Sequence, residues 1–290
     1  FLLITLSLDL YSGTTLYLNL GVPFTVGCAA YSLALLNRDF GIPPEYGIPI
    51  ATLIAVALSF VIFFPSLRIR GVYFSILSLL LPIIFIGVVT SQPLSLYFGG
   101  EGGIPFQPLL FSFARSLPPR ERLPFLQSSH FYLSTAVVIA ALYLTHRVAY
   151  SDFGFMLRAI GQDELLAESS GVDTLKVKLT GFLMSSSLAA LAGALYAAMR
   201  PPVTVDIVVP ANTLVPPLTS VILGGMGTIL GPAIANYITL LVYEVLWDLV
   251  GRWRVVIYMG LLVALIVLRP QGLIFFLYWR LRPVSYTHLT

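Results

Sequence analysis

Long stretches without any charged residue constrain the fold of this chain more than any other feature of its sequence. They cover residues 10–37, 46–67, 71–100, 123–146, 179–199, 207–243 and 255–268. An α-helix needs about 20 apolar residues to cross the hydrocarbon core of a bilayer. The first five stretches therefore hold about one crossing each, and residues 207–243 hold two crossings or one crossing and a re-entrant turn. The last stretch is short, but Trp253 and Arg269 flank it as interfacial anchors.

The composition agrees with a membrane location. Charged residues make up only 10% of the chain and apolar residues 58%, whereas a soluble domain has about 25% charged residues. The apolar stretches also lack the two-residue alternation that barrel strands need. We therefore predict an all-α, polytopic transmembrane helical bundle of about 8 membrane segments, with broken or re-entrant helices among them.

We expect residues 1–282 to form a single transmembrane domain. The chain begins at Phe1 within an apolar stretch, without Met or a basic segment, which we interpret as a truncated start inside a span. Residues 283–290 follow no pattern and are interpreted as a non-native or disordered tail. A slight excess of basic residues places Arg68, Arg70 and the segment 150–175 on the cytoplasmic side.

No catalytic or metal-binding arrangement emerges from the sequence, and we expect no cofactor. The three histidines, His130, His146 and His288, are scattered, and Cys28 is the sole cysteine. The chain lacks a glycine-rich phosphate-binding loop, so it has no nucleotide site of its own. Its net charge of +3 comes from basic residues dispersed at span ends, which argues against nucleic-acid binding. Transport, anchoring and scaffolding remain as function classes.

One glycine cluster lies in the predicted external segment, residues 92–128. It comprises Gly99, Gly100, Gly102 and Gly103, which favour a tight turn because glycine adopts backbone angles closed to other residues. A flexible linker is the alternative. Asp9 is the one carboxylate clearly within a span, and we expect it to face the bundle rather than lipid.

A second glycine cluster falls inside a charge-free stretch. Its members are Gly224, Gly225, Gly227, Gly231 and the adjoining Pro232. We predict that they break a membrane helix beside a transport pathway, with close helix packing as the alternative. Asn19 and Gly21 form a candidate counterpart in the first half of the chain. Paired breaks are typical of secondary transporters, so a stand-alone transporter for a small polar solute remains open.

Residues 150–175 differ from the spans around them. Their mixed charges and helix-forming residues predict one or two short helices on the cytoplasmic face. Ser151 and Asp152 are residue types that cap helix starts.

Five stretches resemble, in order, the permease subunits of ABC importers for branched-chain amino acids, and the resemblance is closest to the second of the two permease subunits. They are residues 18–36 (LNLGVPFTVGCAAYSLALL), 68–79 (RIRGVYFSILSL), 151–198, 223–232 (LGGMGTILGP) and 257–273 (IYMGLLVALIVLRPQGL). The resemblance implies an inner-membrane importer that works by alternating access with a second permease subunit, two ATPase subunits and an extracytoplasmic solute-binding protein.

The resemblance also implies that residues 150–175 dock on the ATPase. The matching residues are Arg158, Ala159, Ile160, Asp163, Glu164, Leu165, Ala167, Glu168 and Gly171. Of these, we expect Ile160, Leu165 and Ala167 to form an apolar ridge for the ATPase groove. Val22-Pro23 stands where the family has His-Ala, and Phe98 where it has Thr. These departures leave urea and short amides as solutes beside branched-chain amino acids.

Overall fold

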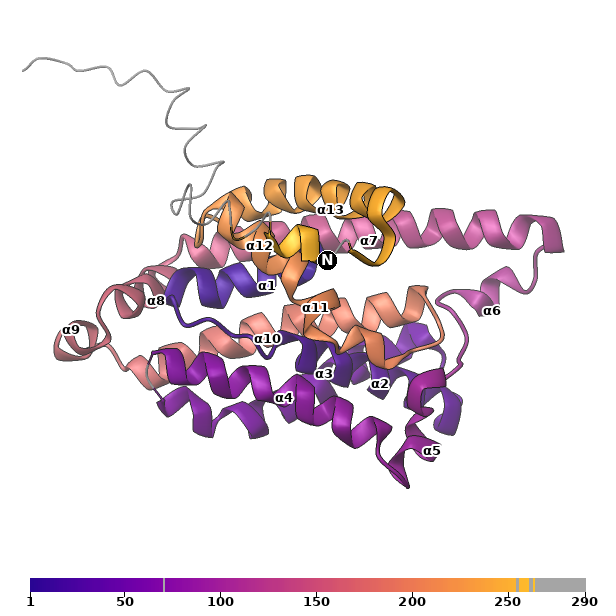
Figure 1. The fold of residues 1–290 in the computed structure, drawn as a ribbon, viewed down its shortest axis with the longest axis horizontal. Helices are drawn as coiled ribbons and strands as arrows, with labels where there is room; N and C mark the ends of the chain where they lie inside the picture. The colour runs from indigo at the N-terminus through magenta and orange to yellow at the C-terminus, as the bar shows by residue number, and fades with distance from the viewer. Residues whose placement is uncertain (70, 254–255, 261–262, 264–290) are drawn as a thin grey trace, which may run out of the picture.

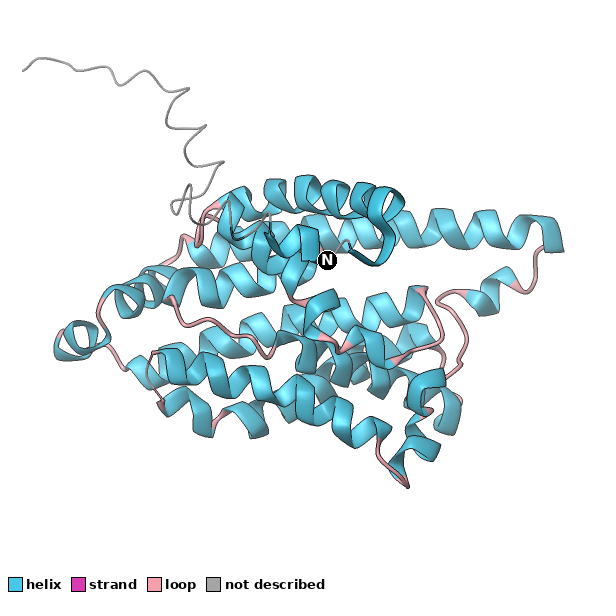
Figure 2. Ribbon diagram, viewed as in Figure 1, coloured by secondary structure: helices cyan, strands magenta, loops and turns pink. Residues whose placement is uncertain are grey.

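The computed structural model describes residues 1–69, 71–253, 256–260 and 263, and Figure 2 shows that their regular structure is helical. Within them, the exception is an isolated β-bridge between Ile104 and Val203. The α-helices are α1 (Leu2–Leu8), α2 (Val22–Phe40), α3 (Pro44–Phe63), α4 (Val72–Thr90), α5 (Leu94–Phe98), α6 (Phe111–Ala114), α7 (Pro119–Ala149), α8 (Asp152–Gln162), α9 (Glu164–Ser169), α10 (Thr174–Met199), α11 (Pro210–Thr213), α12 (Val215–Gly224) and α13 (Leu230–Val250). The shorter turns are the π-helical η1 (Asp9–Gly13) and the 3-10 turns η2 (Pro65–Arg68), η3 (Gly100–Gly102), η4 (Val205–Ile207) and η5 (Gly251–Trp253). The predicted all-α fold class is confirmed.

Four helices of the described chain, α3, α4, α7 and α10, are long and apolar enough to cross a membrane. Each lies over one of the predicted charge-free stretches. The apolar segments Leu2–Gly13 and Leu230–Leu246 are shorter. The stretch 255–268 lies largely outside the described residues, and Arg269 and the tail 283–290 lie wholly outside them. The number of about 8 membrane segments therefore stays a prediction.

Two predicted segments are divided in ways that the sequence did not indicate. Within residues 10–37, residues 16–21 are not helical and α2 begins only at Val22. Pro23 suits this start, since the first turn of a helix needs no backbone N–H from it. The predicted external segment, residues 92–128, contains the short helices α5 and α6 and the first turns of α7, which begins at Pro119.

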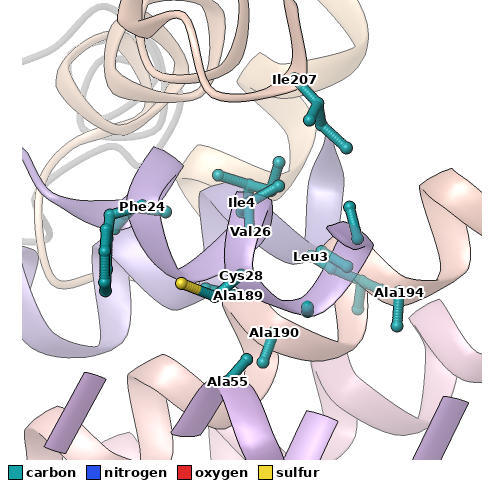
Figure 3. Close-up of a cluster of buried hydrophobic side chains, with 14 of the residues drawn as sticks. Leu3, Ile4, Phe24, Val26, Cys28, Ala55, Ala189, Ala190, Ala194 and Ile207 are labelled. Carbon is teal, nitrogen blue, oxygen red and sulfur yellow. The ribbon is translucent and has the colours of Figure 1, made fainter. Parts of the chain in front are cut away.

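Small side chains pack the centre of the bundle, where α1, α2, α3 and α10 meet. Figure 3 shows Ala55 of α3 close to Ala190 of α10, and both residues are fully buried. Gly193 of α10 lies so near α2 that a Cβ atom there would overlap the carbonyl oxygen of Val26. Lipid chains are as apolar as the helices, so membrane helices associate through such close van der Waals packing.

The two ends of the bundle carry different elements. Figure 1 shows α8 and α9 at one end of the long axis and α5 and α6 at the other. Helix α7 connects these ends, and its 31 residues extend about 46 Å. The arrangement agrees with the predicted opposite placement of the segment 150–175 and the external loop.

Candidate functional site

The segment 150–175 folds into two short helices through its own capping residues. The Ser151 hydroxyl accepts a hydrogen bond from the Gly154 N–H at 3.4 Å at the start of α8. Asp163 Oδ1 accepts bonds from the N–H groups of Leu165, at 2.9 Å, and Leu166, at 3.1 Å. These bonds satisfy backbone donors that the first turn of a helix leaves unpaired. Gly171 follows α9 with φ +90°, a conformation suited to glycine after a helix end.

Burial corrects the predicted apolar ridge of this segment. Ile160 and Ala167 are only 2% and 5% exposed, because they pack with Leu157 of α8 and Val177 of α10 in a small separate core. They are therefore unavailable to another subunit. Leu165 is exposed as predicted, at 63%, and Leu166, which the sequence analysis missed, is 66% exposed. Among the remaining predicted coupling residues, Ala159, Asp163, Glu168 and Gly171 are exposed.

A buried ion pair attaches α9 to the bundle. Lys178 Nζ of α10 lies 2.7 Å from Glu164 Oε1, and the two side chains are 4% and 9% exposed. The Tyr17 hydroxyl donates a hydrogen bond to the other oxygen of Glu164, and the Lys178 ammonium lies 5.2 Å from the centre of the Tyr17 ring. Glu164 thus links three separate segments of the chain, rather than presenting its carboxylate to a partner.

Asp173 caps the start of α10 in an exposed position. Its Oδ1 accepts a hydrogen bond from the Lys176 N–H at 3.1 Å, and its Oδ2 lies 2.7 Å from Lys176 Nζ. The hydrogen bond from the Lys176 side chain lowers the pKa of the Asp173 carboxyl below its ordinary value. The carboxylate therefore stays ionised at neutral pH.

The predicted helix break is present between α12 and α13, where residues 225–229 form a non-helical turn, here termed the inner turn. Cβ atoms at Gly224 and Gly231 would overlap the facing backbone, and Gly225 has φ +92°. Gly224 also faces Pro232. Both interpretations of these glycines hold in part, because the helix is broken there and its two halves pack closely.

Asp9 holds the inner turn from the side of α1. It is fully buried, and its two oxygens accept hydrogen bonds from the N–H groups of Gly227, at 2.6 Å, and Ile229, at 2.8 Å. A carboxylate at a helix N-terminus meets both unpaired donors and the positive end of the helix dipole. The sequence analysis placed Asp9 inside the bundle but missed its partners. The sequence feature that could have indicated this contact is a carboxylate within a membrane span together with a glycine cluster that breaks a membrane helix.

Arg158 of α8 contacts the inner turn as well. Its Nη2 donates a hydrogen bond to the Gly227 carbonyl oxygen at 3.2 Å, and its guanidinium lies 4.9 Å from the centre of the Tyr150 ring. A Cβ atom at Gly227, which has φ +77°, would lie 2.8 Å from the carbonyl oxygen of Gly13. The inner turn is therefore enclosed by η1 on one side and by α8 on another.

The other predicted break residues, Asn19 and Gly21, lie in the non-helical segment 16–21. The Asn19 side chain accepts a bond from the Gly21 N–H at 3.1 Å, and a Cβ atom at Gly21 would overlap the Phe63 ring. The neighbouring Leu20 N–H donates to the Ser78 hydroxyl of α4 at 3.0 Å. This break therefore packs against α3 and α4.

The external glycines form a structured turn that is paired with a distant segment. Gly99, Gly100 and Gly103 have φ values of +77°, +49° and +75°, whereas Gly102 does not need a positive φ. Beyond them, Ile104 and Val203 exchange two backbone hydrogen bonds of 2.9 and 3.1 Å. A Cβ atom at Gly103 would overlap the Val203 carbonyl oxygen. Within the described residues, no group of three or more His, Cys, Asp or Glu side chains is placed to hold a metal ion.

Comparison with known proteins agrees with this architecture. Residues 1–268 match the family described as branched-chain amino acid transport system / permease component. The chain is 28% identical to the high-affinity branched-chain amino acid transport system permease protein LivM of Escherichia coli (strain K12), over 94% of this chain and 67% of that protein. The same values hold for LivM of Salmonella typhimurium.

A shorter match links residues of this chain to a second type of permease. The probable branched-chain amino acid transport permease protein LivH of Methanocaldococcus jannaschii is 33% identical over 37% of this chain and 33% of that protein. No solved structure shows a significant match.

Proposed function

Since this chain belongs to the branched-chain amino acid transport permease family, and is thus a membrane permease subunit of an ABC importer, we propose that it carries branched-chain amino acids across the bacterial inner membrane. The relatives are named for that transport. The many exposed large apolar side chains on α4, among them Ile76, Leu80 and Ile83, support a location within lipid.

The proposed importer contains a second permease subunit, two ATPase subunits and an extracytoplasmic solute-binding protein. ATP hydrolysis takes place on the ATPase subunits. The energy then has to reach the permease through a contact on its cytoplasmic side.

The observation that carries this proposal is the hydrogen bond between Arg158 and Gly227. It joins the helix pair α8–α9 directly to the inner turn, where the membrane helix is broken. A displacement of α8 is therefore transmitted to the joint between α12 and α13. Asp9 of η1 binds the same turn, so α8, η1 and the inner turn meet at one point.

The ATPase docking surface that we propose is centred on Leu165 and Leu166. These two leucines are exposed in the first turn of α9. Ile160 and Ala167 are buried and pack the helix pair against the rest of the permease. Two adjacent exposed leucines on a short, capped helix suit an apolar groove on another protein. Ala159, Glu168 and Gly171 are also exposed in this segment.

The test is a Leu165→Arg/Leu166→Arg variant of the assembled importer. Two charges forced into an apolar contact should lower stimulated ATP hydrolysis by about tenfold or more, and ATPase subunits should co-purify poorly. A variant at Ala167 would confuse the result, because that residue belongs to the permease's own core.

Leu96→Arg is the matched control. Leu96 is 81% exposed on α5, at the opposite end of the bundle, so ATPase subunits should co-purify with this variant as with wild type. Stimulated hydrolysis at the wild-type level in the double variant would contradict the docking surface. Solute uptake by the permease without ATPase or ATP would instead indicate a stand-alone secondary transporter.

A further inference from the structure

The non-helical segment 16–21, here termed the first break, begins where the chain lies against α8. A Cβ atom at Gly161 of α8 would lie 2.6 Å from the carbonyl oxygen of Thr14 and 2.9 Å from the carbonyl carbon of Thr15. Because Gly161 has no side chain, α8 touches the backbone directly before the first break. In Figure 1 the indigo chain that follows α1 turns toward α2 beside α8.

Side-chain contacts add a second connection between the first break and the helix pair α8–α9. The Tyr17 hydroxyl donates a hydrogen bond to Glu164 at the start of α9, and Glu164 is paired with Lys178 at 2.7 Å. The Tyr17 ring packs against the small core that α8, α9 and α10 share. It also meets the Phe74 ring of α4, with 6.2 Å between the ring centres. The helix pair thus contacts both the backbone before the first break and a side chain within it.

Leu16, the first residue of the first break, has a strained backbone. Its φ of +58° lies in the left-handed region, which leucine rarely adopts. The side chain is 53% exposed, so its own burial does not enforce this conformation. The contacts of its two neighbours, Thr15 and Tyr17, with the helix pair do so instead. Strain of this kind persists where the surrounding structure enforces it, and it is common in switch regions.

The inner turn contains a strained residue as well. Ile229 is fully buried and has φ +60°, a conformation that is exceptional for a β-branched residue. Its N–H donates a hydrogen bond to Asp9 Oδ2 at 2.8 Å. Asp9 belongs to η1, which leads through Thr14 and Thr15 into the first break. Each break therefore contains a strained residue, and η1 connects the two breaks.

From these contacts we infer that the first break is a second hinge of the transport cycle, positioned by Tyr17 and Glu164. In its present place, the helix pair holds Leu16 in the strained conformation. A displacement of the helix pair relative to α1 changes the contacts of Tyr17 and lets Leu16 relax. The same displacement reaches the inner turn through Arg158, so both breaks change together. This inference rests on the proposed function, in which the ATPase subunits move the helix pair.

The first test is Tyr17→Phe in the assembled importer, reconstituted in vesicles. The variant removes the hydroxyl and keeps the ring that packs on the helix pair. ATPase subunits should co-purify and hydrolyse ATP at the wild-type rate, whereas the uptake of labelled L-leucine per ATP should fall about fivefold. Tyr31→Phe is the matched control. Tyr31 is 2% exposed, and its hydroxyl has no hydrogen-bond partner in the part of the chain that the structure describes, so uptake per ATP should not change.

The second test is Leu16→Gly, which removes the strain because glycine adopts a positive φ readily. The present conformation then becomes more favourable relative to the relaxed one, so leucine uptake should fall at least about twofold, without a lower melting temperature. Leu110→Gly is the matched control. Leu110 has φ +62° in the external segment, outside the helix pair, so its replacement should leave leucine uptake unchanged.

The outcomes separate this hinge from the proposed function. Wild-type uptake per ATP in Tyr17→Phe would overturn the hinge and leave the proposed function standing. Equal losses of uptake and hydrolysis with a lower melting temperature would show a structural role alone and would also overturn it, as would equal responses of Leu16→Gly and Leu110→Gly. Leucine uptake by the wild-type protein without ATP would refute the proposed function, and this inference with it.

Discussion

Glu164 and Lys178 form an ion pair that is almost fully withdrawn from solvent, and Tyr17 adds a hydrogen bond to it. The contact joins α9, α10 and the non-helical segment 16–21 through charged groups, at the end of the bundle where the ATPase is proposed to bind. A charge left alone in such a place is costly, because it keeps its desolvation penalty and loses its counterion.

Lys178→Met should lower the free energy of unfolding of the permease by about 3–5 kcal/mol, because Glu164 stays buried without its cation. Adding Glu164→Gln should recover most of the loss. Lys176→Met is the matched control, since the Lys176–Asp173 pair is 81% and 51% exposed and, like other solvent-exposed ion pairs, contributes little to stability. Chemical unfolding in detergent measures all three. Equal losses for Lys178→Met and Lys176→Met would contradict the assignment.

Both carboxylate oxygens of Asp9 accept hydrogen bonds from the inner turn, so Asp9→Asn should lower the stability of the permease. An amide offers one oxygen, and its NH₂ group would face a backbone N–H, which leaves a buried donor unpaired at a cost of about 1–3 kcal/mol. The melting temperature should fall for Asp9→Asn and stay unchanged for Asp152→Asn, an exposed acid in the first turn of α8. A stable Asp9→Asn protein would show that these bonds contribute little.

At the scale of elements, the two irregular turns η1 and the inner turn contact each other through glycines. Gly13 of η1 faces Gly227 of the inner turn, and a side chain on either residue would press on the backbone of the other. This contact lets η1, α12 and α13 converge beside α8. The joint that we propose to move during transport is therefore also tightly packed.

Gly227→Ala should impair transport and stability together. The residue has φ +77°, and the added Cβ atom would lie 2.8 Å from the Gly13 carbonyl oxygen, so strain and overlap combine to cost at least about 1 kcal/mol. Gly87→Ala is the control, because a Cβ atom there in α4 meets nothing within 4 Å. ATP-driven uptake and melting temperature are compared in both variants. A Gly87→Ala protein as impaired as Gly227→Ala would point to a general effect of glycine replacement.

At the scale of the whole molecule, the bundle separates two functional ends. The helix pair α8–α9 lies at one end, and α5 and α6 lie toward the other. The inner turn and the buried Asn236, which donates hydrogen bonds to Thr5 of α1 and Ser220 of α12, lie between them. The ATPase contact that we propose and the external loop are thus at opposite ends of one membrane domain.

This polarity predicts the sides from which two exposed serines can be reached. In intact cells, an impermeant thiol reagent should label Ser116→Cys, and in inside-out vesicles it should label Ser169→Cys. Buried Cys28 keeps the background low. Labelling of both cysteines from the same side would contradict the proposed topology.

Sequence by itself determined the features that depend on local chemistry. A helix spanning lipid needs a long charge-free stretch, so the apolar helices α3, α4, α7 and α10 could be placed from composition. Ser151 was predicted to cap a helix start and does so for α8, while Asp152 lies in its first turn and Asp163, predicted as a coupling residue, caps α9. The glycines from Gly224 onward weaken a helix wherever it lies.

Only the tertiary structure decided which surfaces and partners these elements use. Asp9 and Gly227 are separated by 218 residues in sequence, and no local pattern announces their hydrogen bond. Ile160, Ala167 and Leu165 are all apolar, yet two are buried and one is exposed. In a membrane protein, lipid-facing, buried and partner-binding positions can all be apolar, so hydrophobic pattern does not distinguish them. That distinction arises only when helices pack, because packing determines which apolar face is covered and which donors each buried charge can reach.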